Sequence, residues 1–213
     1  DLFTDVLRHD LLNSVSVIHS SVDLLEDVVE DQEIIDVIEN QTNKLEDTIE
    51  KASTLAHVES FEKLDLVGSD LSEYVKDAME EMKTLAQKKG IVLKGEFEGR
   101  YPVKCNPIFK EVPINLISNA IKYGPTDSKI SIGIEDDGDG WRIMVKDNGQ
   151  GIPDEYKKDI FHRFIRKEKG GTKGTGLGLA IVQGIVALHK GSVWVEDNKP
   201  RGSIFYVKVP KEQ

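Results

Sequence analysis

The stretch Asn-Leu-Ile-Ser-Asn-Ala-Ile-Lys-Tyr, residues 115–123, carries two asparagines four positions apart within an apolar run. In a helix, Asn115 and Asn119 share one face, which Lys122 borders three positions further on. Two amide oxygens beside a lysine suit a hydrated Mg²⁺ that is held between side chains and phosphate groups. One asparagine alone is more often part of a solvated polar face, so this pattern needs support from other segments.

A second segment, Asp-Asn-Gly-Gln-Gly-Ile-Pro at residues 147–153, follows a run that alternates like a strand. Gly149 and Gly151 permit tight turns and the close approach of a flat ligand ring. The carboxylate of Asp147 can accept a hydrogen bond from an adenine amino group. The same residues would also make an ordinary turn after a strand, so this segment alone leaves both interpretations open.

A third segment, Gly-Thr-Gly-Leu-Gly-Leu at residues 174–179, opens a predicted helix. Backbone N–H groups and the positive end of the helix dipole can face phosphate groups there. The glycine spacing is neither that of a dinucleotide-binding Rossmann loop nor that of a Walker P-loop. The stretch before it, residues 154–173, is rich in Lys and Gly, which predicts a lid with basic residues for phosphate. Phe161 and Phe164 would anchor this lid.

Composition limits the kind of protein. With 213 residues, 38% of them hydrophobic, the chain can build one sizeable core with a helical appendage. A net charge of -10 argues against a nucleic-acid partner, because binding to phosphate backbones needs clustered Lys and Arg. The single cysteine, Cys105, excludes an intramolecular disulfide framework and fits a reducing compartment. No apolar run approaches the ~20 residues of a membrane span, so we expect no direct membrane contact by this chain.

The first 60 residues contain neither Gly nor Pro, and apolar residues recur there every three to five positions. This spacing predicts two amphipathic helices, joined near residues 29–33. Two such helices cannot cover both of their apolar stripes, so a second, identical hairpin is needed to complete a four-helix bundle. We therefore expect residues 1–62 to form a dimerisation domain. Because the helical pattern is already under way at Asp1, we also expect the intact protein to extend upstream.

Beyond about residue 64 the chain changes to short β-rich runs, glycines and further helices, which predicts a second domain over residues 63–213. Asn106 should cap one of these helices, and Pro113 should bend it. The fold class expected for the whole chain is α+β, with a helical hairpin followed by an α/β sandwich. The predicted helices are 70–89, 106–123 and 176–189, and the predicted strands are 64–67, 91–97, 129–135, 141–146, 192–197 and 203–209.

A short motif in the first helix, His-Asp-Leu-Leu-Asn at residues 9–13, completes a recognisable set. The order of the motifs resembles the sensor histidine kinases of two-component signalling, whose ATP-binding domain has the Bergerat, or GHKL, fold. The resemblance extends over essentially the whole chain. It matches the family's H box at 9–13, N box at 115–123, G1 box at 147–151, F box at 161–164 and G2 box at 174–179.

The resemblance implies a site for ATP and Mg²⁺. Asn115 and Asn119 would hold Mg²⁺, Lys122 would contact phosphate, Tyr123 would pack near the adenine, and Asp147 would bind the adenine amino group. Arg163 or Arg166 would reach the phosphates from the lid. The further contacts to ATP implied by the family are Gly149, Gly151, Ile152, Phe164, Gly174, Thr175, Gly176, Leu177 and Gly178.

The resemblance also makes His9 the phosphoacceptor, since a neutral imidazole nitrogen is a competent nucleophile near neutral pH. Asp10 would orient the ring or take its other proton. Asn13, one helical turn later, would position a water for removing phosphate from the aspartate of a response regulator. The receiver domain of that regulator is the implied partner, with a homodimer as the implied assembly.

Two departures from the family pattern affect the first helix, because Ser14 stands where a proline is usual and Arg8 where a serine is common. Neither removes a reacting group. A non-catalytic dimeric scaffold and an ATPase of the chaperone or DNA-repair kind are the alternatives, and the hairpin with its histidine motif counts against the second. We expect the chain to be the cytoplasmic part of a larger sensor, in a family that has both membrane-anchored and soluble members.

Overall fold

The computed structural model describes residues 11–22, 32–61, 63–163 and 175–211. The chain divides into two compact units, residues 1–61 and 62–213. Within the described ranges, no helix is both long and apolar enough to cross a membrane.

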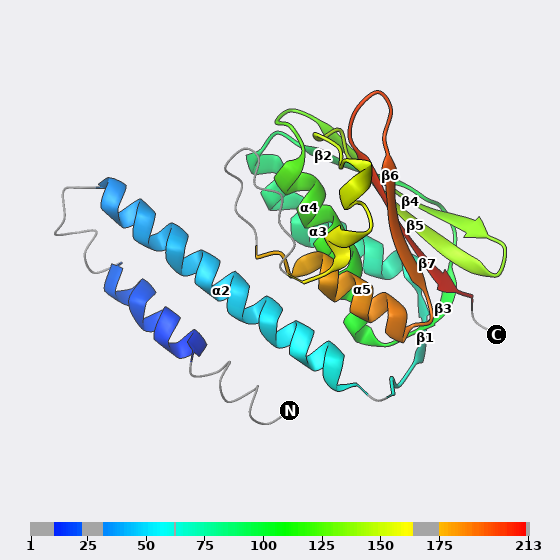
Figure 1. The fold of residues 1–213 in the computed structure, drawn as a ribbon, viewed down its shortest axis with the longest axis horizontal. Helices are drawn as coiled ribbons and strands as arrows, with labels where there is room; N and C mark the ends of the chain where they lie inside the picture. Colours follow the sequence, from blue (N-terminus) through cyan, green and yellow to red (C-terminus); the bar gives the residue numbers. More distant parts are fainter. Residues whose placement is uncertain (1–10, 23–31, 62, 164–174, 212–213) are drawn as a thin grey trace. The chain divides into compact units, whose positions relative to one another are not determined.

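The first unit is helical, with one helix over residues 11–22 and a second, α2, over Gln32–Ser60. The two helices run in opposite directions (Figure 1), as the hairpin pattern predicts. Val15, Val22 and Ile35 are buried, whereas other apolar side chains of the same helices remain open to solvent. The most exposed of these are Val37, at 59%, and Val17, at 65%.

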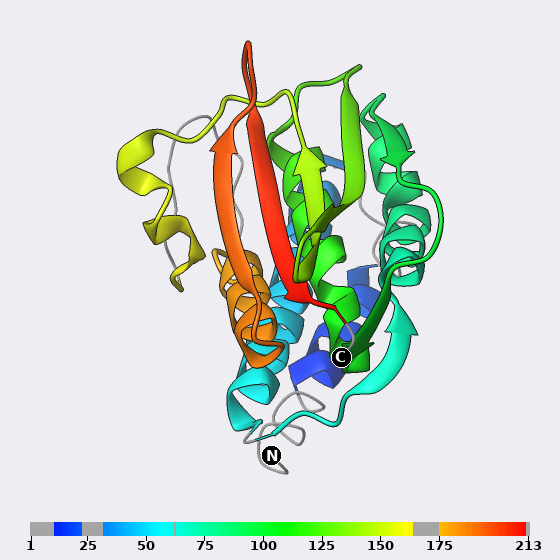
Figure 2. The same ribbon diagram turned by 90° about the vertical axis from the view of Figure 1, so that its right-hand side faces the viewer.

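The second unit is built on a five-stranded sheet in the order β2-β4-β5-β7-β6, in which β2 runs parallel to β4 and the other neighbours are antiparallel. Three helices cover one face of this sheet (Figures 1 and 2), which makes a two-layer α/β sandwich. The strands are β2 (Val92–Glu96), β4 (Lys129–Asp137), β5 (Gly140–Lys146), β6 (Ser192–Asp197) and β7 (Ser203–Pro210), and the helices are α3 (Leu71–Lys88), α4 (Glu111–Tyr123) and α5 (Gly178–Leu188).

The core lies between the sheet and these helices. Residues alternate between buried and partly exposed along β7, because successive strand side chains point to opposite faces. Ile132 and Ile143 from the sheet and Leu116 and Ile185 from the helices are fully buried. The helix-covered face of the sheet therefore supplies the hydrophobic contacts that fix where α4 and α5 lie.

A two-stranded sheet, β1 (Val67–Asp70) with β3 (Pro102–Cys105), precedes α4. The predicted strand at 64–67 overlaps β1 at Val67 alone, and β3 was not predicted because four residues with one Pro and one Lys give little alternation to detect. Asp70, predicted to begin a helix, instead caps α3 by accepting a hydrogen bond from the Ser72 N–H at 2.9 Å.

The predicted helix over 106–123 is in fact a short 3₁₀ helix, η1 (Pro107–Lys110), followed directly by α4. Asn106 caps η1 as expected, since its Oδ1 accepts from the Ile108 N–H at 3.0 Å. The change from a 3₁₀ helix to an α-helix shows how the chain accommodates Pro113. A proline ring clashes with the carbonyl four residues earlier, here that of Phe109, so the irregularity falls one turn before Pro113. Within α4 itself Pro113 lies in the first turn, where a missing N–H is tolerated.

The end of α4 is held by a lysine from the end of α3. The Nζ of Lys89 donates hydrogen bonds to the carbonyls of Ile121, Lys122 and Gly124 at 2.7, 2.9 and 2.9 Å. A cation at a helix C-terminus satisfies carbonyls that have no partner in the helix and interacts favourably with the helix dipole. Lys89 thereby fixes the end of the helix that carries the two predicted site asparagines.

His189, just after α5, is a buried structural histidine. Its Nδ1 lies 2.7 Å from the carbonyl of Ile185 and its Nε2 accepts from the Asn106 N–H at 3.0 Å, an arrangement that requires the neutral ring with its proton on Nδ1. Burial lowers the pKa of His189 below its ordinary value of 6.5, although the bond to Ile185 acts in the opposite direction.

The stability of the second unit should accordingly fall in acid. A histidine with a lowered pKa in the folded state takes up its proton first in the unfolded state, so its contribution is complete above pH about 6.5 and is lost as the pH falls below that value. We expect His189→Ala to lower the free energy of unfolding by roughly 2–4 kcal/mol at pH 7.5 and by less at pH 5.5. Urea denaturation at both pH values measures this, with the exposed His162→Ala as the control; an equal loss at both values contradicts the assignment.

Candidate functional site

Helix α4 brings the predicted asparagines to one face. Asn115 is 7% exposed, and its Nδ2 donates to the carbonyl of Glu111 at 2.8 Å. This bond fixes the side-chain amide, so that Oδ1 is the atom left for another partner. Asn119 and Lys122 are half-buried on the same helix, and Tyr123 at its end is 51% exposed. The Nζ of Lys122 lies 5.3 Å from the centre of the Tyr123 ring.

Asp147 follows the last residue of β5 and is 5% exposed. Its Oδ1 accepts hydrogen bonds from the backbone N–H groups of Gly149 at 2.7 Å and Ser203 at 3.3 Å. No hydrogen bond from the described residues reaches Oδ2. Burial raises the pKa of Asp147 above its ordinary value, although both N–H groups act to lower it. The carboxylate therefore has one oxygen anchored by the backbone and one left to accept from a ligand.

Two glycines bring the three motif segments into contact. A Cβ atom at Gly149 would lie 2.8 Å from the carbonyl oxygen of Tyr123, so the segment after β5 packs directly on the end of α4. A Cβ at Gly178 would lie 2.6 Å from Oδ1 of Asn115, so the first residue of α5 packs on the side-chain amide of Asn115. Segments that are about 30 and 60 residues apart in the chain thus meet along α4.

A short turn precedes α5. Gly176 has a φ of 72°, and the Leu177 N–H donates to Oγ1 of Thr175 at 3.4 Å. Leu177 is 2% exposed, which buries the residue that precedes the helix. The helix begins at Gly178, two residues later than predicted, with backbone N–H groups that the helix itself does not satisfy. Such a helix end binds anionic groups when they are available.

The remaining predicted residues divide between described and undescribed segments. Phe161 ends the short helix η3 (Asp159–Phe161), is buried, and packs edge-on against Phe205 with ring centres 6.4 Å apart. Arg163 is exposed shortly after it. Asn13 lies in the helix over 11–22, where it is exposed. His9, Asp10, Phe164, Arg166 and Gly174 fall outside the described residues.

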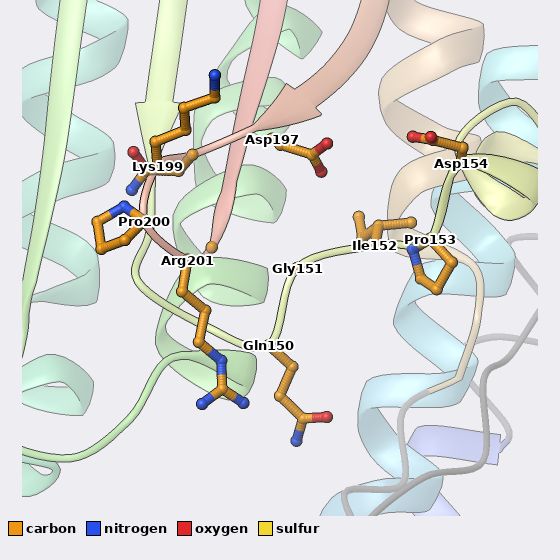
Figure 3. Close-up of a pocket in the computed structure, with 11 residues that line it drawn as sticks. Gln150, Gly151, Ile152, Pro153, Asp154, Asp197, Lys199, Pro200 and Arg201 are labelled. Carbon is orange, nitrogen blue, oxygen red and sulfur yellow. The ribbon is translucent and has the colours of Figure 1, made fainter.

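A cavity of about 520 Å³ lies beside Gly151 and Ile152. Its second wall is the turn between β6 and β7, over residues 197–202, and Figure 3 shows Lys199, Pro200 and Arg201 of this turn across from Gln150. Neither asparagine of α4 lines it. The cavity is therefore next to the glycine segment but is separate from the contacts between α4 and α5.

One contributor was not predicted. Ser203, the first residue of β7, is 4% exposed and supplies a backbone N–H to the carboxylate of Asp147. Every residue except proline has a backbone N–H, so the residue type does not reveal this donor. The Ser203 N–H lies beside Asp147 because β5 and β7 pair with Lys146 opposite Ile204. The sequence pattern of residues 203–209 predicts the strand but not its neighbour.

Comparison with known proteins gives a consistent result. Residues 107–213 match the family model described as histidine kinase-, DNA gyrase B- and HSP90-like ATPase. The phytochrome-like protein Cph1 of Synechocystis is 32% identical over 217 residues, which cover 98% of this chain and 29% of that protein. The sensor-like histidine kinase SenX3 of Mycolicibacterium smegmatis is 32% identical over 176 residues, which cover 80% of this chain and 46% of that protein. The chain thus spans less than half the length of either relative.

A solved structure has the same fold over nearly the whole chain. The structure of full-length ShkA in complex with AMPPNP superimposes with a TM-score of 0.78 and 22% identity, and covers 97% of this chain and 45% of that one. At this level of identity the likeness concerns the fold.

Proposed function

Because the chain belongs to the family of histidine kinase-, DNA gyrase B- and HSP90-like ATPases and is homologous to sensor histidine kinases, we propose that it is the kinase core of such a sensor. In this proposal residues 63–213 bind ATP, and residues 1–62 carry the phosphoacceptor. The γ-phosphate passes from ATP to His9, and from His9 to an aspartate of a response regulator.

The observation that carries the proposal is that the segment after Asp147 and the start of α5 both pack against α4, the helix that carries Asn115. The missing Cβ atoms of Gly149 and Gly178 allow the G1 segment to touch the end of α4 and the start of α5 to touch Asn115. These close approaches place the G1 segment and the start of α5 against the helix that carries Asn115 and Asn119. They support a site with an adenine at Asp147 and phosphate groups near the N-terminus of α5.

The same geometry fits a magnesium ion that arrives with the nucleotide. The Oδ1 atom of Asn115 is directed by the bond from its Nδ2 to Glu111, and Asn119 lies one turn later on the same face. Two neutral amide oxygens are too few for Mg²⁺ alone, which usually keeps waters and takes phosphate oxygens. Among the described residues, no group of three or more Asp, Glu, His or Cys side chains is arranged to hold a metal ion. Asn115 and Asn119 would therefore hold Mg²⁺ together with the phosphates, whose negative charge it would neutralise.

Gly178→Ala tests this contact. Alanine should favour a helix over glycine, so any loss reports the 2.6 Å approach of the new Cβ to Oδ1 of Asn115. Asn115 is 7% exposed and bonded to Glu111, which leaves it little room to move. We expect the affinity for Mg-ATP to fall about 10- to 100-fold, as overpacking by 1–3 kcal/mol predicts. Calorimetric titration measures it, with Gln183→Ala on the exposed side of α5 as control; an unchanged affinity contradicts the assigned contact.

The acceptor step is a substitution at phosphorus. A ring nitrogen of neutral His9 attacks the γ-phosphorus, the bond to the bridging oxygen breaks, and ADP leaves with that electron pair. Asp10 would orient the ring or take the proton from its other nitrogen, which leaves the phosphorylated ring neutral. The lysine of the N box, Lys122, would stabilise the charge on the phosphates.

Assembly as a homodimer is part of the proposal. Exposed apolar side chains on the first unit have no cover within the described residues, and a second hairpin would bury them. They are Leu11, Val17, Ile18, Ile34, Val37 and Leu45. Asn13, which is exposed on the helix over residues 11–22, would position a water for dephosphorylation of the regulator.

The test is incorporation of radiolabelled γ-phosphate from Mg-ATP into this chain. We expect a label that is lost in acid and kept in alkali, the behaviour of a phosphoramidate. An acid-stable label, or none despite measurable ATP binding, contradicts autophosphorylation by this chain and favours a scaffold that binds ATP.

A further inference from the structure

The strand pair β5–β7 changes its hydrogen bonding at Asp147. In an antiparallel sheet, two residues of a hydrogen-bonded pair exchange both N–H···O bonds. The Asp147 N–H does donate to the carbonyl of Ser203, at 3.0 Å. The Ser203 N–H, which would normally return a bond to the Asp147 carbonyl, donates instead to the carboxylate Oδ1 at 3.3 Å.

The vacated carbonyl of Asp147 is taken by a side chain. The Nδ2 of Asn198 donates to it at 2.7 Å and lies 3.2 Å from Oδ1 of Asn148. Asn198 is 4% exposed, and its own N–H donates to the carbonyl of Gly202 at 3.0 Å, which closes the turn between β6 and β7. This buried amide is therefore fixed at both its backbone and its side chain.

Gly202 is what lets the turn come so close. Its φ is 121°, and a Cβ there would stand 2.1 Å from the Asp147 carbonyl oxygen. Without a side chain at this position, the turn can place Asn198 against the backbone of the segment that follows β5. The wall that Figure 3 shows across from Gln150 is this same turn.

We propose that Asn198 is a positioning residue that sets the preference of the site for adenine, because it occupies the Asp147 carbonyl and so leaves the Ser203 N–H to hold the carboxylate. The inference rests on the proposed function, in which Asp147 binds the adenine amino group. Asn198 itself touches no substrate; it acts through Ser203 and Asp147.

Loss of the Asn198 amide reverses the exchange. The buried Asp147 carbonyl then has no donor and recaptures the Ser203 N–H, since an unsatisfied buried carbonyl is costly. Oδ1 keeps only the Gly149 N–H, and the carboxylate becomes free to turn about its side-chain torsion. The oxygen that faces the adenine is no longer fixed. The discrimination between adenine and guanine therefore weakens more than the contacts to the phosphates do.

The experiment compares the affinities for Mg-ATP and Mg-GTP by calorimetry in the whole chain and two variants. Asn198→Asp replaces the donating NH₂ by an oxygen of the same size, and Asn198→Leu replaces the amide by an apolar group of similar volume. The matched control is Asn40→Asp, which makes the same chemical change at an exposed amide on α2. We expect the ratio of ATP to GTP affinity to fall about five- to tenfold in both Asn198 variants, the worth of one hydrogen bond, and to stay unchanged in the control.

A pH profile separates positioning from a general loss of structure. Fewer donors on the carboxylate raise the pKa of Asp147, so the acid midpoint of ATP binding should move to higher pH in Asn198→Leu. The profile is measured in this variant because the new carboxylate of Asn198→Asp would raise the pKa of Asp147 by repulsion alone. No titratable side chain of the described part contributes to the pKa of Asp147, which is set by burial and the two N–H groups.

Equal losses for ATP and GTP, or an unchanged ratio in either variant that folds, overturn the inference. Circular dichroism establishes folding, and Asn198→Leu serves if Asn198→Asp does not fold. Asp147→Asn separates a failure of the proposed function from a failure of the role of Asn198. If Asp147→Asn leaves the affinity for ATP intact, the proposed function itself fails. If Asp147→Asn weakens ATP binding but the Asn198 variants keep the wild-type ratio of ATP to GTP affinity, only the role of Asn198 is refuted.

Discussion

Replacing His9 by glutamine is expected to abolish phosphate incorporation while leaving the affinity for Mg-ATP unchanged within about twofold, the limit for sites without shared partners. Glutamine has no nucleophilic ring nitrogen, so no bond to phosphorus forms. All the described residues of the proposed ATP site belong to the second unit, residues 62–213. Binding and transfer should therefore separate cleanly.

The measurement is the acid-labile label in parallel with a binding titration. His19→Gln is the matched control, because it makes the same change at a half-buried histidine of the helix over residues 11–22. We expect full labelling in that control. Residual acid-labile label in His9→Gln would mean that another histidine is the acceptor, and the role of the first motif would be wrong.

The sheet and the long helices of the second unit were predictable because their periodicities are strong. Residues 129–135 and 141–146 alternate and are joined by a turn rich in Asp and Gly, and they form β4 and β5. Where local signals were weak, prediction failed. Strand β3 has four residues. The 3₁₀ segment lies one turn before Pro113, whose ring would clash with the Phe109 carbonyl in a regular α-helix, and the spacing of apolar residues does not indicate such a change of helix type.

The side chains of the candidate site could be proposed from the sequence, but their geometry could not. Asn115 and Asn119 follow from helical spacing, and Asp147 follows from its place after a strand. The contacts of Gly149 with Tyr123 and of Gly178 with Asn115 are tertiary, so the sequence marks only that glycine is present. The donors from Ser203 and Asn198 depend on which strands pair, and an amide or a backbone N–H is not distinctive enough to be singled out beforehand.

Asp147→Asn should weaken ATP binding about 100-fold and reverse the preference of the site between bases. In the wild-type protein Oδ1 is held by the N–H groups of Gly149 and Ser203. An asparagine must turn its oxygen toward these two donors, which places its NH₂ where Oδ2 stood. That NH₂ then faces the adenine amino group, donor against donor. The loss combines a hydrogen bond to a charged acceptor, about 1.5–3 kcal/mol, with an unpaired buried donor.

The same rotated amide is complementary to a different base. A donor at the position of Oδ2 suits the carbonyl oxygen that guanine and hypoxanthine carry where adenine has its amino group. We therefore expect Asp147→Asn to bind Mg-ITP and Mg-GTP better than Mg-ATP, in titrations run side by side with the wild-type chain.

Removal of a charge from a site that is 5% exposed should also stabilise the nucleotide-free fold at neutral pH. Burial raises the pKa of Asp147, and a carboxyl group with a raised pKa disfavours folding above its unfolded pKa of about 3.9. Weaker ATP binding in a more stable protein would place the defect in base recognition, whereas equal weakening for all three nucleotides would mean that Asp147 does not contact the base.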